Sequence, residues 1–133
     1  MISDENDRKV LIDYRLNQAI ESLETVHFLI INNQFILAVN RVYYGMFYAL
    51  SALALKHEFQ TSKHAQLIGW FNKEFVSTKK VNQDTGWALK KAYGNRTKGD
   101  YDLFISFEKE EVDLMLHELK NFISEIETLL SNQ

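Results

Sequence analysis

Residues 38–50 read AVNRVYYGMFYAL, and this stretch decides the fold. Apolar residues occur on nearly every side of it at helical spacing, which is typical of the central helix of a helical bundle. The stretch nevertheless carries Asn40, Arg41 and three tyrosines. Because a buried charge is costly unless it is paired and hydrogen-bonded, Arg41 indicates that this helix opens onto a cleft or contacts a second chain.

Hydrophobic periodicity along the rest of the chain predicts five helices and no strand. The expected ranges are about 4–31, 34–57, 61–75 and 84–95, and from 106 to the C-terminal end. The absence of proline allows such long helices, because proline is the strongest helix breaker. The fold class that follows is all-α, an up-and-down bundle of about five helices with long first and last members. It is expected to form one domain over residues 1–133.

Capping residues predict where two of these helices begin. Residues 61–62, Thr-Ser, offer an N-cap for the third helix. Ser106 is expected to begin the last helix, with only half of a capping box, because Lys109 stands where Glu is preferred.

The helix expected over residues 34–57 has two faces of different character. One face mixes a cation, phenols and small residues: Leu37, Arg41, Tyr44, Tyr48 and Ala52, with Gly45 alongside. The other face is an apolar stripe expected in the core: Ile36, Val39, Tyr43, Met46, Phe47, Leu50 and Leu53. The mixed face is either a dimer seam, in which Arg41 pairs with a carboxylate, or a ligand site, since both use amphipathic anchors.

A second polar cluster occupies residues 95–102 and reads NRTKGDYD. Gly94 and Gly99 are expected to bracket a break after the fourth helix, with Arg96 inside it. A cation at the C-terminal end of a helix is favoured by the helix dipole, and this alone could explain the arginine. The functional alternative is that Arg96 binds a phosphate group.

The neighbours of Arg96 offer it partners. Gly99 allows a tight turn that would return Asp100 or Tyr101 to Arg96. Asp100 could pair with Arg41 or with Arg96, and either pair would organise a site or an interface.

Composition and charge narrow the classes of protein. The chain has no cysteine, which excludes disulfides, thiolate catalysis and cysteine-ligated zinc. Its acidic start and the lack of a run of about 18 apolar residues predict no secretory signal and no membrane contact, so we expect a cytoplasmic protein. Net charge is −3, yet residues 63–98 hold eight basic and two acidic residues. Such a basic segment attracts phosphate, although helical proteins also segregate charge by chance.

The four histidines lack the one-turn spacing of a helical metal site, so we expect no metal and no cofactor. His64 lies in the first turn of the third helix and is the best candidate for an exposed, functional histidine; the alternative is an ordinary surface residue. The sequence has no glycine-rich phosphate loop, no Gly-x-Ser-x-Gly and no paired carboxylate motif. A stand-alone hydrolase, kinase or dehydrogenase therefore has no support.

Three blocks of the sequence resemble the HEPN superfamily (higher eukaryotes and prokaryotes nucleotide-binding), in particular its small stand-alone prokaryotic members. The blocks are AVNRVYYGMFYA at 38–49, KHAQLIGWFNKEFV at 63–76 and YGNRTKGDYD at 93–102, followed by an acidic final helix. The resemblance implies an all-α bundle that commonly dimerises, and many members are toxins paired with a minimal nucleotidyltransferase antitoxin. Active members are metal-independent ribonucleases with an Arg-x4–6-His motif at the dimer cleft, where histidine transfers protons and arginine stabilises phosphate charge.

On this chain the motif arginine is Arg96, and Tyr101 stands in place of the histidine. Because tyrosine, with a pKa of about 10, is a poor base near neutral pH, the resemblance favours a binding role over an enzymatic one. Tyr101 is also a candidate for modification with nucleotide, since some paired toxins carry such a tyrosine near this motif. The candidate catalytic residues are Arg96, Tyr101 and His64. The expected nucleotide- or phosphate-binding residues are Arg96, Lys98, Asp100, Tyr101, Arg41 and Tyr44, with Lys90 and Lys91 attracting the polyanion.

The leading hypothesis is a homodimeric HEPN protein that binds nucleotide or RNA and works with a nucleotidyltransferase partner in a module of the toxin–antitoxin type. One alternative is a metal-independent HEPN ribonuclease that uses His64 for proton transfer. Another is a structural dimeric adaptor without a ligand, in which the polar residues serve assembly.

Overall fold

The computed structural model describes residues 4–132, which form five α-helices and one π-helical turn, with no strand among them. In chain order the elements are α1 (Glu5–Ile31), α2 (Phe35–Lys56), α3 (His64–Phe71), the π-helix η1 (Asn72–Val76), α4 (Gln83–Tyr101) and α5 (Lys109–Ser131). The predicted all-α bundle is confirmed, and the bounds of the first two helices agree with the prediction to within one residue.

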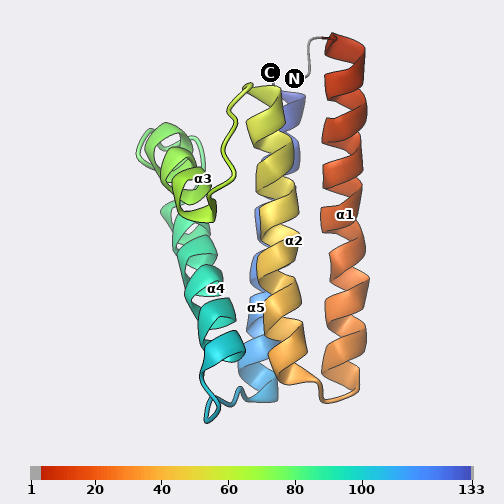
Figure 1. Cartoon of the computed structure of the whole chain (residues 1–133), viewed down its shortest axis with the longest axis vertical. Helices are drawn as coiled ribbons and strands as arrows, with labels where there is room; N and C mark the ends of the chain where they lie inside the picture. Colours follow the sequence, from red (N-terminus) through yellow and green to blue (C-terminus); the bar gives the residue numbers. More distant parts are fainter. Residues whose placement is uncertain (1–3, 133) are drawn as a thin grey trace.

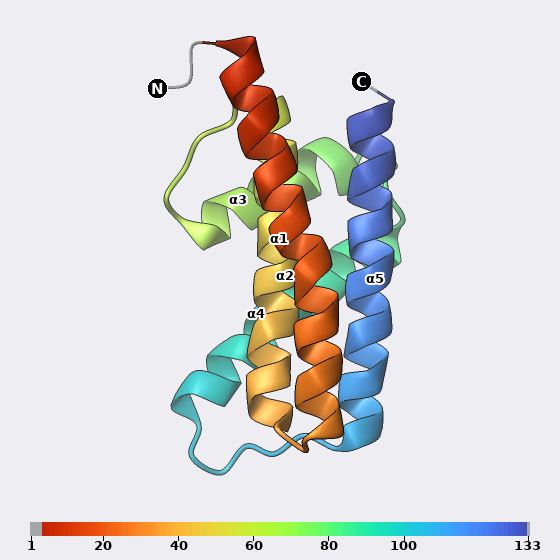
Figure 2. The ribbon, with the colours of Figure 1, turned by 90° about the vertical axis from the view of Figure 1, so that its right-hand side faces the viewer.

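The three long helices α1, α2 and α5 lie side by side, and α4 packs along another side of α2 (Figure 1). The shorter α3 lies across the bundle axis in the turned view (Figure 2). The N-terminal end of α1 and the C-terminal end of α5 are at one end of the bundle, and the α1–α2 turn and the α4–α5 connection are at the other. None of the described helices is both long and apolar enough to cross a membrane.

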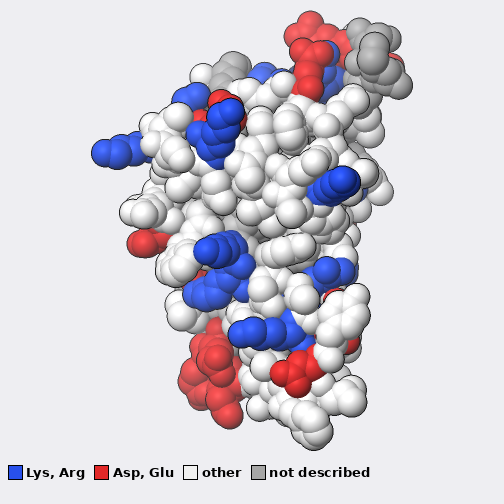
Figure 3. All heavy atoms as spheres, turned by 60° about the vertical axis from the view of Figure 1, so that its left-hand side comes forward, with Lys and Arg blue, Asp and Glu red and all other residues white. Residues whose placement is uncertain are grey.

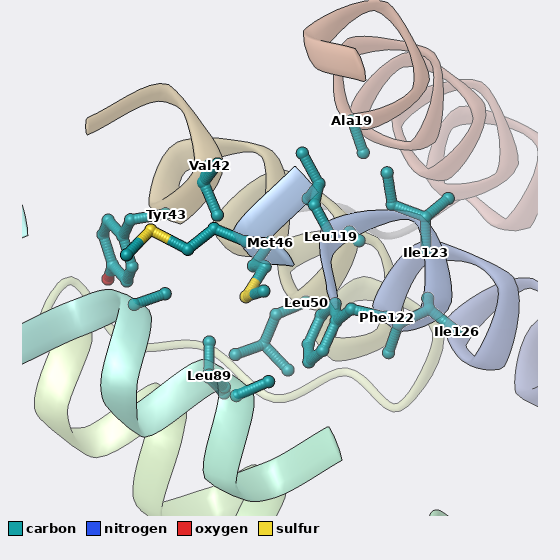
Figure 4. Packing of buried hydrophobic residues seen from close by; sticks show 14 of the residues in the cluster. Ala19, Val42, Tyr43, Met46, Leu50, Leu89, Leu119, Phe122, Ile123 and Ile126 are labelled. Atoms are coloured by element: carbon teal, nitrogen blue, oxygen red, sulfur yellow. The ribbon is translucent and has the colours of Figure 1, made fainter. Parts of the chain in front are cut away.

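α2 forms the centre of the core, as its nearly continuous apolar character predicts. The members of the predicted stripe that are at most 1% exposed are Val39, Tyr43, Met46, Leu50 and Leu53. Met46 and Leu50 lie close to Leu89 of α4 and Phe122 of α5 (Figure 4). Because burying one large apolar side chain contributes about 1.5–3 kcal/mol, this contact region is a main source of stability.

Two residues of α2 lie on faces other than those predicted. Ile36, expected in the core, is 43% exposed, because it lies in the first turn of α2 at an end of the bundle. Ala52, expected on the mixed face, is fully buried, because four other α-helices pack on α2. Because four other helices contact α2, no face of this helix consists of polar residues alone.

Gly45 allows α1 and α5 to approach α2 closely. A Cβ atom at this position would clash with Ser22 Oγ of α1 and lie 2.9 Å from Leu119 Cδ1 of α5. The buried Ser22 hydroxyl is satisfied, because it donates to the Ala19 carbonyl at 2.5 Å. Gly45, which lies alongside the mixed face, therefore admits two helices of the same chain.

The predicted break between Gly94 and Gly99 is wrong, because α4 continues through both glycines to Tyr101. Neither glycine has a positive φ. Arg96 pairs with Asp100 one turn further on, Nε to Oδ2 at 3.2 Å. A helical glycine costs only about 1 kcal/mol relative to alanine, so two of them do not end a helix that lacks proline.

Two helix starts also differ from the prediction. α3 begins at His64, after residues 61–62, and the helix then continues as η1. α5 begins at Lys109 rather than at Ser106, because Glu108 is the N-cap and forms a complete capping box with Glu111. The Glu108 backbone N–H donates to Glu111 Oε1 at 3.0 Å. Glutamate is not among the favoured N-cap residues, so the capping rule did not find it.

Candidate functional site

The candidate site is built on two adjacent tyrosines of α2, Tyr43 and Tyr44. Their rings meet edge to face, with centroids 5.3 Å apart. The Tyr43 hydroxyl lies 2.7 Å from Nδ1 of His64 in α3, whereas the Tyr44 hydroxyl accepts a hydrogen bond of 2.9 Å from Nη2 of Arg96 in α4. Three helices therefore place polar groups around one aromatic pair. We refer to Arg41, Tyr43, Tyr44, His64, Arg96 and Asp100 as the Arg96 cluster.

Arg96 is half-buried and has unused hydrogen-bonding capacity. Its Cζ lies 5.4 Å from the ring centroid of Tyr44 and 5.9 Å from that of Tyr43. Nε is buried close to the Asp100 carboxylate but makes no hydrogen bond with any described residue. An arginine side chain has five N–H donors, and the bond to Tyr44 is the one that this guanidinium makes among the described residues. The group is held in place, and apart from the bond to Tyr44 the N–H groups of its two Nη atoms have no partner among the described residues.

Arg41 brings a second guanidinium group to the same tyrosine. Its Cζ lies 4.8 Å from the Tyr44 ring centroid. Nε and Nη2 both donate to Asn40 Oδ1, at 3.2 and 3.0 Å. Among the described residues no carboxylate pairs with Arg41. Of the two pairings predicted for Asp100, the structure shows the one with Arg96. Two cations next to one phenol produce a local positive potential that suits an anion.

His64 belongs to the Arg96 cluster rather than to the open surface. Its ring stacks on Phe47, with centroids 4.3 Å apart and planes 20° apart. Burial, and then the charge of Arg96, lower the pKa of His64 from 6.5, so the imidazole is neutral near pH 7. Burial, and then the neighbouring Tyr93, raise the pKa of the Tyr43 hydroxyl well above its usual range, so this hydroxyl stays protonated.

Four of the six predicted binding residues meet in the structure, namely Arg41, Tyr44, Arg96 and its ion-pair partner Asp100. Tyr101 lies at the C-terminal end of α4, 80% exposed and more than a helical turn beyond Arg96. Lys98 is exposed and forms no ion pair with a described residue. The predicted turn at Gly99 is absent, and Asp100 reaches Arg96 as its helical i+4 neighbour instead.

The side of the molecule formed by α3 and α4 comes forward in Figure 3, which shows Lys and Arg side chains across the middle of this face and an acidic region below them. Of the two lysines expected to attract a polyanion, Lys91 pairs with Glu118 at 2.8 Å, and the Nζ of Lys90 lies 5.1 Å from the Trp87 ring centroid. In the described part of the chain no three His, Asp or Glu side chains are grouped closely enough to hold a metal ion.

Sequence reasoning missed the role of Tyr43, which it assigned only to the core. The available signal was the hydroxyl itself, because a buried tyrosine hydroxyl needs a hydrogen-bond partner, whereas phenylalanine would fill the same space without one. The identity of that partner, His64, depends on the path of residues 57–63 and could not be read from spacing.

The protein is thus an all-α bundle in which a half-buried arginine of α4 faces the tyrosines of α2. The HEPN domain family model matches residues 12–129, and the chain belongs to this family.

Three individual proteins are similar to this chain over most of their length. The chain is 35% identical to a protein named "UPF0332 protein" from Thermotoga maritima, over 96% of each chain. It is 33% identical to "Putative toxin MJ0142" from Methanocaldococcus jannaschii, over 86% of this chain and 78% of that protein. It is 31% identical to "Putative toxin MJ0605" from the same organism, over 83% of this chain and 81% of that protein.

Proposed function

We propose that this protein is a toxin-like HEPN module that binds a phosphate-bearing ligand, a nucleotide or RNA, at the Arg96 cluster. The observation that carries the proposal is the guanidinium of Arg96, which is fixed by Tyr44 and Asp100 while its other Nη N–H groups have no partner among the described residues. Arginine binds phosphate through paired N–H donors, and a preorganised guanidinium loses less entropy on binding.

Three other members of the Arg96 cluster have roles in this proposal. Arg41, stacked on Tyr44, adds a second positive charge within reach of the same anion. Asp100 orients Arg96 through their ion pair and reduces the net charge of the empty site. The Tyr44 hydroxyl, which accepts from Arg96, keeps its own O–H free to donate to a phosphate oxygen.

The resemblance to the family supports the partners that we propose. The names of the two Methanocaldococcus relatives support a toxin-like role, and the resemblance to paired HEPN toxins supports a homodimer that works with a nucleotidyltransferase antitoxin. Arg41 lacks a carboxylate partner among the described residues, which is consistent with a face that a second chain or a ligand completes.

Equilibrium binding of labelled ATP and labelled RNA tests the proposal. Arg96→Ala should weaken binding by about tenfold to a hundredfold, because a charged hydrogen-bonding group is lost, whereas Arg96→Lys should give an intermediate value. Lys120→Ala, which removes an exposed cation from α5, is the matched control and should bind as the wild type does. Equal binding by wild type and Arg96→Ala, or binding by neither, would show that the site is wrongly assigned.

A second candidate function, metal-independent ribonuclease activity, is favoured by the position of His64 beside Arg96. If Nδ1 donates to the Tyr43 hydroxyl, Nε2 of the neutral ring keeps a lone pair and can take a proton. In such a reaction Nε2 would take the proton of an RNA 2′-hydroxyl, whose oxygen then attacks the adjacent phosphorus. The P–O5′ bond breaks, the leaving oxygen takes a proton from solvent, and Arg96 stabilises the charge on the phosphoryl oxygens.

Incubation of the purified protein with tRNA in the presence of a chelator tests this second function. Cleavage by the wild type that is lost in His64→Ala would support it. Intact RNA at a large excess of protein, or equal cleavage by the wild type and by His64→Ala, would reject it.

A further inference from the structure

The outer side of α4 carries an exposed tryptophan that the Arg96 cluster does not use. Trp87 is 64% exposed, which is unusual because tryptophan is normally well covered in a folded protein. It lies nine residues before Arg96, so at 100° per residue the two side chains are on opposite sides of the helix and about 14 Å apart along its axis.

A hollow of about 480 Å³ lies beside Trp87, between η1 and α4. Its polar lining comes from Asn72, Gln83, Asp84 and Lys90. Gly86 brings η1 close to α4 here, because a Cβ atom at this position would lie 2.9 Å from Val76 Cγ2. The hollow therefore combines an aromatic face with amide, carboxylate and ammonium groups, which suits the face and the edge of a nucleobase.

Exposed residues continue from Trp87 along the same face of α4. Positions 87, 91, 94, 98 and 101 are spaced alternately by four and three residues, so they form one stripe. Aromatic residues stand at both ends, Trp87 and Tyr101, with two lysines between them: Lys91, which pairs with Glu118, and Lys98, which forms no ion pair with a described residue. No atom outside the helix lies within 4 Å of where a Gly94 Cβ would be, so a ligand can approach the backbone there.

We propose that this stripe, with the hollow beside Trp87, binds a single-stranded nucleic acid, one base stacking on Trp87 and a second on Tyr101. The stripe is about 21 Å long, which corresponds to roughly six nucleotides at the stacked rise of 3.4 Å. Lys90 and Lys98, which pair with no carboxylate among the described residues, contact phosphates. The inference rests on the proposed function and extends it: the phosphate at Arg96 belongs to a strand whose next nucleotides pass round α4 to the stripe.

Charge and composition favour this occupant over a protein. The cores of protein interfaces are depleted in lysine, whereas single-strand binding surfaces combine aromatic side chains with a basic path. The polar lining of the hollow likewise suits a base with donors and acceptors on its edge.

Tryptophan fluorescence gives a direct readout, because the chain has two tryptophans and Trp70 is stacked on Phe59 inside the fold. In a Trp70→Phe protein, Trp87 is the sole reporter. Single-stranded RNA of about ten nucleotides should quench it by stacking, and DNA of the same sequence shows whether the sugar matters. The same RNA should leave the emission of a Trp87→Phe protein, in which Trp70 reports, nearly unchanged.

Affinity measurements separate stacking from the Arg96 cluster. Trp87→Ala should raise the Kd for the oligonucleotide by about tenfold, Trp87→Tyr should restore most of the affinity, and Trp87→Leu should not, because stacking needs a π-face. ATP binding should be unchanged in Trp87→Ala but weakened by about tenfold to a hundredfold in Arg96→Ala. Leu114→Ala, another exposed apolar residue on α5, is the control and should alter neither.

Distinct outcomes overturn the two ideas. Equal oligonucleotide binding by wild type and Trp87→Ala, with weaker binding by Arg96→Ala, rejects the stripe and leaves the proposed function standing. No binding of any oligonucleotide by the wild type rejects the stripe, and the proposed function falls as well only if the wild type also fails to bind ATP. A change in self-association of Trp87→Ala by sedimentation, without a change in RNA affinity, identifies the surface as a protein interface and rejects the stripe.

Discussion

Tyr43 and His64 connect the core of this protein to its candidate site. The Tyr43 side chain is as buried as any apolar residue of α2, yet its hydroxyl ends 2.7 Å from an imidazole that is partly open to solvent. The same side chain therefore fixes the packing of α2 and the position of His64, which lies beside Arg96.

Removing the Tyr43 hydroxyl should be measurable. Tyr43→Phe keeps the ring and deletes the hydrogen bond, so the free energy of unfolding should fall by about 1 kcal/mol in urea denaturation. Tyr48→Phe is the matched control, because no described residue bonds to its hydroxyl, and it should change stability by less than about 0.5 kcal/mol. Equal effects of the two variants would show that the contact with His64 contributes nothing.

The lowered pKa of His64 predicts how stability depends on pH. The unfolded chain binds a proton at this residue near pH 6.5, whereas the folded protein does so only at lower pH. The contribution is thus fully present above pH 6.5 and is lost as the pH falls through the folded pKa. Urea denaturation at a series of pH values should show the decline, and His64→Gln should flatten it in that window. NMR titration of the His64 ring that gives a pKa above 6.5 would contradict the prediction.

At the scale of elements, α2 is held between α1 and α5 by a contact that only glycine allows. The Cβ atom of Gly45→Ala would meet Ser22 and Leu119. We expect this variant to lose about 1–3 kcal/mol of stability through overpacking. Gly69→Ala is the control, because the position is helical and nothing lies within 4 Å of the added atom, so it should be neutral or stabilising. Combining Gly45→Ala with Ser22→Ala should recover part of the loss, and no recovery would place the strain at Leu119 alone.

The element scale also shows what sequence patterns can predict. The helical periodicity of apolar residues predicted the bounds of α1 and α2 to within one residue, because many positions contribute to the pattern. The predicted end of α4 and the predicted start of α5 were wrong, because each prediction depended on only one or two residues. Gly94 and Gly99 did not end the helix, and Glu108 served as an N-cap in place of a more favoured residue.

The candidate site was predictable as a list of residue types but not as a geometry. Arg41 and Tyr44 were named from the mixed face of their helix and Arg96 from the polar cluster at residues 95–102, and the fold brings the three together. The contact between residues 43 and 64 and the π-helix η1 depend on tertiary packing, which leaves no periodic trace in the sequence.

At the scale of the whole molecule, the position of Arg41 bears on assembly. Its guanidinium stacks on Tyr44 and bonds to Asn40, with no carboxylate partner in the described chain. If a second copy supplies that carboxylate, Arg41→Ala should shift the protein from dimer to monomer in sedimentation velocity. A variant that stays dimeric would place the dimer seam elsewhere, and a wild type that is monomeric at micromolar concentration would contradict the homodimer itself.

The glycines at positions 94 and 99 make the last two turns of α4 the part of that helix with the least intrinsic resistance to local opening. Each costs about 1 kcal/mol of helix propensity relative to alanine. Backbone amides there should exchange with deuterium faster than those of α2, and ATP should slow them, because a ligand held by Arg96 must order this segment. Gly94→Ala, whose added methyl meets nothing, should slow exchange and tighten ATP binding up to about fivefold. The affinity for ATP would then be set in part by how readily the end of one helix frays, at a residue on a different side of α4 from Arg96.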